Sequence, residues 1–171
     1  MSLQATLGLV AWQEQRGARW GAVAGGGETA LDYGDPAGEY GALRDGCGLV
    51  DLSWRDRLVV GGADRQRFLN AYLTCDLKEL AVGQGAFGFV TSAQGRILAD
   101  AVVAALADRL LVLLPAARGA AIREHLARFV LADRVELQTA QAPTPLALVG
   151  PGADGVLAAA GSPAPAADWQ A

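Results

Sequence analysis

One carboxylate in an otherwise apolar run constrains this sequence more than any other feature. Asp100 lies within Ile97–Leu106, where every other residue is aliphatic. An ionised carboxylate is costly to bury unless a partner compensates its charge. The segment before it, Ser92–Gly95, has the composition of a tight turn, so the run is predicted to be the second strand of a β-hairpin.

The predicted strand is mostly apolar on both of its faces. Alternation places Leu98, Asp100 and Val102 on one face, and Ala99 and Ala101 on the other. A strand that is apolar on both faces is normally covered on both. We therefore expect Asp100 to lie in a core or at the wall of a cavity, beside a partner.

Strands and helices are predicted on both sides of this hairpin. Further β-rich runs occur at Leu49–Ser53, Arg57–Val60, Ala86–Thr91, Arg109–Leu114 and Asp133–Gln138. Apolar stripes at helical spacing occur in Arg65–Leu73 and from Pro115 to Val130. From residue 57 to 138 the order β-α-β-β-β-α-β predicts an α+β fold. The expected form is a ferredoxin-like split βαβ antiparallel sheet with helices on one face.

The remaining segments lead us to divide the chain into three parts. Residues 1–50 are expected to form a glycine-rich lead-in with a helix within Ser2–Arg19, and residues 51–139 the core. Residues 140–171 are expected to be a linker followed by the start of an incomplete strand–helix unit. Its strand, Leu146–Val149, has no evident partner, and the low-complexity end Ser162–Ala171 indicates a fragment.

Composition excludes several classes of function. A net charge of −4 argues against direct, phosphate-driven binding to nucleic acid. The longest apolar runs fall short of the about 20 residues that a membrane span requires, and no secretory signal is evident, so we expect a cytoplasmic protein. With Cys47, Cys75 and His125 as the only soft ligands, no metal site is predicted, and His125 is expected to be a half-exposed surface residue.

An ordered set of short segments resembles the N-terminal part of the folate-binding aminomethyltransferase superfamily. This superfamily includes the glycine-cleavage T-protein and the YgfZ-like folate-binding proteins. The segments, in chain order, are Glu39–Arg44, Gly48–Ser53, Leu58–Arg65, Phe68–Leu69, Thr74–Asp76, Leu80–Gly83 and Gly95–Asp100. The resemblance implies a site for tetrahydrofolate or another reduced folate, with the pterin in a central cavity.

The superfamily's acidic residue falls on Asp100. A carboxylate there could accept hydrogen bonds from the pterin N–H groups and, in a transferring enzyme, act as the catalytic acid–base residue. The resemblance assigns Phe87, Leu98 and Val102 to the apolar wall of the folate site, with Pro115 also in it. In the alternative interpretation, Asp100 caps a strand end or pairs with Arg96 or Arg109.

Three positions depart from the T-proteins. These carry Tyr at the position of Phe87, an acidic residue at Ala99 and Asn at Pro115, and each change removes a hydrogen-bonding group. The departures favour the YgfZ-like branch, which implies an accessory factor in iron–sulfur protein maintenance or tRNA modification. Two alternatives stay open. One is an aminomethyltransferase that moves an aminomethyl group from a lipoyl carrier to tetrahydrofolate, and the other is a truncated, non-catalytic interaction domain.

Overall fold

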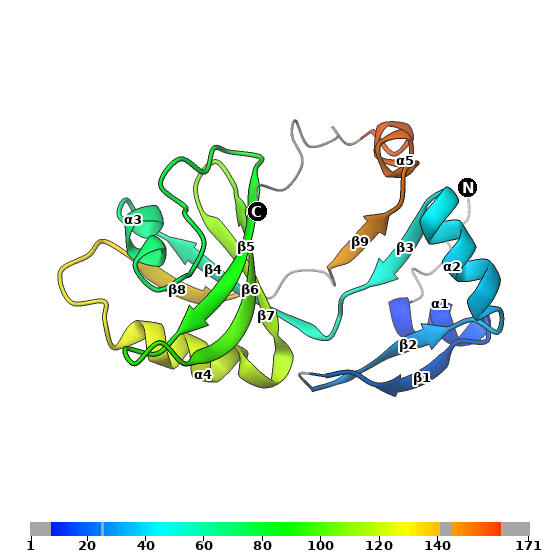
Figure 1. Cartoon of the computed structure of the whole chain (residues 1–171), viewed down its shortest axis with the longest axis horizontal. Helices are drawn as coiled ribbons and strands as arrows, with labels where there is room; N and C mark the ends of the chain where they lie inside the picture. The colour runs from blue at the N-terminus through cyan, green and yellow to red at the C-terminus, as the bar shows by residue number, and fades with distance from the viewer. Residues whose placement is uncertain (1–7, 25, 141–144, 162–171) are drawn as a thin grey trace.

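A five-stranded antiparallel sheet is the largest sheet among the described residues. The computed structural model describes residues 8–24, 26–140 and 145–161 (Figure 1). The strand order is β5-β6-β7-β4-β8. These strands are β4 (Arg55–Gly61), β5 (Gly85–Thr91), β6 (Ile97–Ala105), β7 (Leu110–Pro115) and β8 (Glu136–Thr139). When the edge strand β5 is left out, the remaining strand order β6-β7-β4-β8 is that of a ferredoxin-like split βαβ sheet. The predicted fold class is therefore confirmed.

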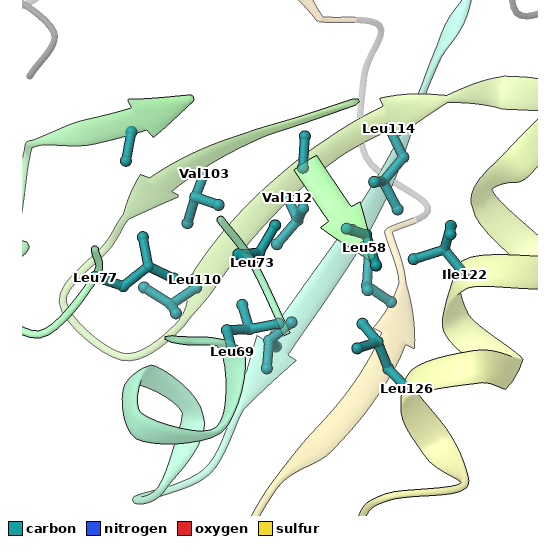
Figure 2. Packing of buried hydrophobic residues seen from close by; sticks show 14 of the residues in the cluster. Leu58, Leu69, Leu73, Leu77, Val103, Leu110, Val112, Leu114, Ile122 and Leu126 are labelled. Atoms are coloured by element: carbon teal, nitrogen blue, oxygen red, sulfur yellow. The ribbon is translucent and has the colours of Figure 1, made fainter. Parts of the chain in front are cut away.

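Two helices, α3 (Arg65–Asn70) and α4 (Ala116–Ala127), contribute to the core on one face of this sheet. Strand side chains on that face are buried, among them Val60, Val103 and Leu114, each 0% exposed. Figure 2 shows Ile122 and Leu126 pointing from α4 toward Leu58 of β4. The apolar stripe that predicted α4 therefore supplies one wall of the core.

The opposite face, which we call the open face, has no such cover among the described residues. Phe87, Val102 and Leu113 face it in a row across β5, β6 and β7, as the strand register shows. Phe87 is 47% exposed, and Val102 and Leu113 are half-buried. The prediction that both faces of the strand would be covered is wrong within this part of the chain, because the helices pack on one side.

The N-terminal region adds a β-hairpin that the sequence did not predict. Its elements are α1 (Leu9–Gln15), β1 (Arg19–Ala22), β2 (Glu28–Asp32) and α2 (Pro36–Asp45). Strands β1 and β2 pair antiparallel, and Gly26 and Gly27 in the turn between them have φ of 90° and 99°, a backbone that favours glycine. The predicted N-terminal helix is confirmed over Leu9–Gln15, and residues 2–7 lie outside the described residues.

A second small sheet joins the segment after α2 to the C-terminal part of the described chain. Strand β3 (Gly48–Asp51) pairs antiparallel with β9 (Leu146–Val149), which leads into α5 (Ala153–Ala159). The prediction that residues 146–149 have no partner is wrong, because the partner lies far earlier in the chain, where no local pattern indicates it. The division into three parts stays a prediction. The linker at 141–144 and the end at 162–171 lie outside the described residues.

Candidate functional site

The carboxylate of Asp100 is paired with Arg55. The Arg55 Nη1 group donates to Oδ2 of Asp100, and the two side chains are 15% and 27% exposed, respectively. The two alternative partners lie elsewhere, since Arg109 pairs with Asp108 at 2.9 Å and Arg96 is exposed beside the β5–β6 turn. A guanidinium therefore compensates the one charge of the apolar strand.

Strand register brings this pair together. Arg55 lies opposite Pro115 in the β4–β7 ladder, and β7 lies between β4 and β6, so Arg55 reaches Asp100 across the end of β7. The guanidinium carbon of Arg55 also lies over the ring of Trp54, 4.3 Å from the ring centroid. The 45-residue separation between Arg55 and Asp100 explains why no local pattern identified the partner.

An aromatic and aliphatic surface adjoins the pair on the open face. The rings of Phe87 and Phe89 meet edge to face at 5.4 Å between centroids, and Val102 lies directly opposite Phe87. Phe89 lies opposite Asp100 in the same ladder. Three of the predicted site residues, Asp100, Phe87 and Val102, thus share one face, and Pro115 lies buried at its border, opposite Arg55.

Leu98 is not part of this surface. Val90 pairs with Ala99 and Thr91 with Ile97, which leaves Leu98 as the extra residue of a β-bulge. Its side chain packs against the buried core and lines a hollow with Ile122 of α4. The structure therefore separates Leu98 from Asp100, although simple alternation places them on the same face.

Of the other chemically capable side chains, Cys75 lines a hollow at the edge strand β5 together with Phe87, whereas Cys47 and His125 lie apart from this face. Cys47 and Cys75 are free thiols, and partial burial raises the pKa of the Cys75 thiol above its usual value. His125 is half-buried, with its ring 5.3 Å from that of Phe129. Across the part of the chain that the structure describes, no group of three or more His, Cys, Asp or Glu side chains could hold a metal ion. No described helix has the length and apolarity needed to cross a membrane.

Comparison with known proteins connects this geometry to one family. The family described as the GCVT N-terminal domain matches residues 9–168. An aminomethyltransferase of Herpetosiphon aurantiacus is 32% identical over 141 residues, which cover 78% of this chain and 38% of that protein. Sarcosine oxidase subunit alpha of a Corynebacterium species is 32% identical over 127 residues, covering 70% of this chain and 13% of that subunit.

The solved structures include a close match in fold. The crystal structure of glycine cleavage system aminomethyltransferase T from Bartonella henselae has a TM-score of 0.82 at 28% identity, and covers 94% of this chain and 45% of that one. The chain therefore spans less than half the length of these relatives. On the extent of the family match and the shared fold, the chain belongs to the family described as the GCVT N-terminal domain.

Proposed function

We propose that the open face of the five-stranded sheet is part of a binding site for a reduced folate. Tetrahydrofolate is the first candidate ligand. The observation that carries this proposal is the meeting of one part-buried carboxylate with a half-exposed aromatic and aliphatic surface. Few polar groups on an apolar lining are typical of small-molecule sites. The match to the GCVT N-terminal domain, together with the resemblance to the folate-binding aminomethyltransferase superfamily, supports the choice of ligand.

The proposed roles of the residues follow from their chemistry. Arg55 engages Oδ2 of Asp100, which leaves Oδ1 to accept from the amino and ring N–H groups of a pterin. Phe87 and Val102 would contact the flat pterin ring from one side. Pro115 would border the ring near Arg55, and Leu98 would act only indirectly, by packing the bulge next to Asp100.

Because the face is open, we expect this chain alone to bind folate weakly. The relatives are more than twice as long as the match, and the resemblance to T-proteins implies a folate enclosed by several domains. Further protein placed over the open face would exclude water and strengthen the contacts of Asp100. Sub-micromolar affinity of the 171-residue chain would contradict this part of the proposal.

Two functions are compatible with folate binding. The names of the relatives favour aminomethyl transfer, in which a lipoyl carrier delivers the aminomethyl group and Asp100 serves as the acid–base residue. A specific observation favours the second function, an accessory protein of the YgfZ-like type that acts on iron–sulfur proteins or in tRNA modification. Phe87, Ala99 and Pro115 offer no side-chain hydrogen bond, and Ala99 is buried on the helix-covered side. Either function would operate in the cytoplasm.

Titration with tetrahydrofolate tests the shared claim. We expect Asp100→Asn to weaken binding about tenfold, because one charge-assisted hydrogen bond is lost. Asp133→Asn is a matched control, since Asp133 is also paired with an arginine and its side chain is 22% exposed, but it lies outside the open face. Equal affinity of wild type and Asp100→Asn, at comparable thermal stability, would remove Asp100 from the site.

A turnover assay separates the two functions. The whole chain would be given tetrahydrofolate and an aminomethyl-loaded lipoyl carrier, and the formation of methylenetetrahydrofolate, with release of ammonia and the free lipoyl thiol, would be followed. Turnover that disappears in Asp100→Asn would establish the transferase. Folate binding without turnover would favour the accessory function.

A further inference from the structure

A hollow on the helix-covered side of the sheet lies apart from the proposed folate site. It has a volume of about 410 Å³, within the range of small-molecule sites. The turn between β5 and β6 lies beside α4 (Figure 1), and the hollow is formed between the start of β6 and α4. Its lining residues are Ile97, Leu98, Arg118, Ala121, Ile122, Glu124, His125 and Arg128.

Two arginines of the hollow differ from most others in the chain. Six arginines form ion pairs with aspartates, namely Arg19, Arg44, Arg55, Arg67, Arg109 and Arg134. Arg118 and Arg128 are exposed, and neither has a carboxylate partner within the described ranges. In a chain with a net charge of −4, two uncompensated guanidinium groups on one hollow favour an anionic ligand.

His125 also lines the hollow. Its Nε2 atom is shut off from solvent and has no hydrogen-bond partner among the described residues. Buried polar groups are normally satisfied, and leaving one without a partner costs free energy. Because protein atoms close off Nε2, a ligand in the hollow would meet the remaining edge of the half-buried ring, so His125 is a reporter of binding and not a proposed contact.

The spacing of the charges defines the shape of the ligand. Arg118 is in the first turn of α4 and Arg128 caps its end, so they lie roughly 15 Å apart along the helix axis. Ile97, Leu98 and Ile122 provide apolar surface in the same hollow. One compact anion would contact only one of the two guanidinium groups.

We propose that this hollow binds an elongated small molecule with an apolar middle and an anionic group, a carboxylate or a phosphate, at each end. The apolar middle lies against Ile97, Leu98 and Ile122, and the two anionic groups pair with Arg118 and Arg128. Glu124 places one negative charge in the same wall and opposes this binding. The Glu124→Gln variant should therefore bind about twofold more tightly.

Because His125 is the only histidine in the chain, its imidazole signals can be followed by NMR without ambiguity. The whole chain would be titrated at fixed pH with decanedioate, octanoate, 1,8-octanediol bisphosphate and inorganic phosphate. Decanedioate and 1,8-octanediol bisphosphate, which carry an anionic group at each end, should shift the imidazole signals at lower concentration than octanoate or inorganic phosphate. A comparison of decanedioate with 1,8-octanediol bisphosphate shows whether the hollow prefers carboxylate or phosphate ends.

Arginine variants test the two ends of the hollow. Arg118→Ala and Arg128→Ala should each weaken the binding of whichever of these two ligands binds wild type more tightly, by about fivefold or more. Arg123→Ala is the matched control, because Arg123 is on the same helix but does not line the hollow, and its affinity should stay within about twofold of wild type. Unmoved His125 signals, equal binding of inorganic phosphate, or an equal loss in Arg123→Ala would overturn the proposal.

Discussion

The two faces of the five-stranded sheet are built from the same strands, but one face is buried in the core and the other is partly exposed. On the covered face, Ala101, Val103 and Val112 are at most 2% exposed and pack into a continuous core. On the open face, their immediate neighbours Asp100 and Val102 remain half-buried. Side chains on one side of β6 therefore stabilise the core, and those on the other side form an apolar surface with a single ion pair.

This difference indicates where mutations should affect stability and where they should affect binding. Covered-face side chains are tightly packed, so shortening one leaves a cavity. Open-face side chains have solvent on one side, and shortening one removes surface for a ligand with less cost to folding.

The largest expected effect comes from two adjacent leucines of β7. Leu114 is 0% exposed on the covered face, and Leu113 is half-buried on the open face. Leu114→Ala should lower the free energy of unfolding by about 3 kcal/mol, and Leu113→Ala by about 1 kcal/mol. Urea denaturation of both variants measures the difference. Equal losses would mean that the two faces are equally buried in solution.

The Arg55–Asp100 pair should give the next largest effect. Arg55→Met leaves the Asp100 carboxylate partly buried without its partner, and should cost about 1–2 kcal/mol, between the values of buried and exposed pairs. A double-mutant cycle with Asp100→Asn measures the coupling free energy. Independent, additive losses would show that the two side chains do not interact in solution.

Phe87 should affect binding more than stability. Because its side chain is 47% exposed, Phe87→Ala should change the free energy of unfolding by less than about 1 kcal/mol. The affinity for tetrahydrofolate should fall about tenfold through loss of the aromatic contact. Val82→Ala, at an apolar side chain that is 66% exposed, is the control and should bind as wild type does. Unchanged affinity of Phe87→Ala would place the folate elsewhere.

The smallest effect concerns Asp64, which precedes the covering helix α3. The Arg134 backbone N–H donates to its carboxylate at 2.9 Å and, with a smaller contribution from the Arg134 guanidinium, holds the pKa of Asp64 below its usual value. A lowered pKa stabilises the fold at pH values above the usual carboxyl pKa, and this contribution is lost as pH falls through the lowered value.

The Asp64→Asn variant should therefore lose less stability than wild type on acidification. Urea midpoints from neutral pH down to about pH 3 measure the difference. Parallel pH profiles for the two proteins would show that this contact does not contribute to acid sensitivity.

Local patterns predicted the regular elements of the core well. The alternation from Ala99 to Ala105 and the apolar stripe of α4 each follow from the periodicity of one element, and both are confirmed. The β1–β2 hairpin was missed because its short strands carry little alternation. The pairing of β3 with β9 was missed because it joins segments that are far apart in the chain.

In the candidate site too, local patterns identified single residues but not the contacts that depend on the pairing of distant strands. Asp100 was singled out correctly as a charge that needs a partner, but Arg55 becomes its partner only through the order of three strands. Leu98 was assigned to the face of Asp100 by simple alternation, and a single bulge residue places it against the core instead. Register and bulges depend on the pairing of whole strands, so a one-strand pattern does not predict them.

The most direct test of the open face as the folate site is NMR of assigned methyl groups during titration with tetrahydrofolate. Val102 and Leu113 lie on the open face, and their chain neighbours Val103 and Leu114 are buried on the covered face. Shifts of the Val102 and Leu113 methyl signals, with those of Val103 and Leu114 nearly unchanged, are the predicted result. Larger shifts at Val103 and Leu114, or no shifts at any of the four residues at saturating folate, would contradict it.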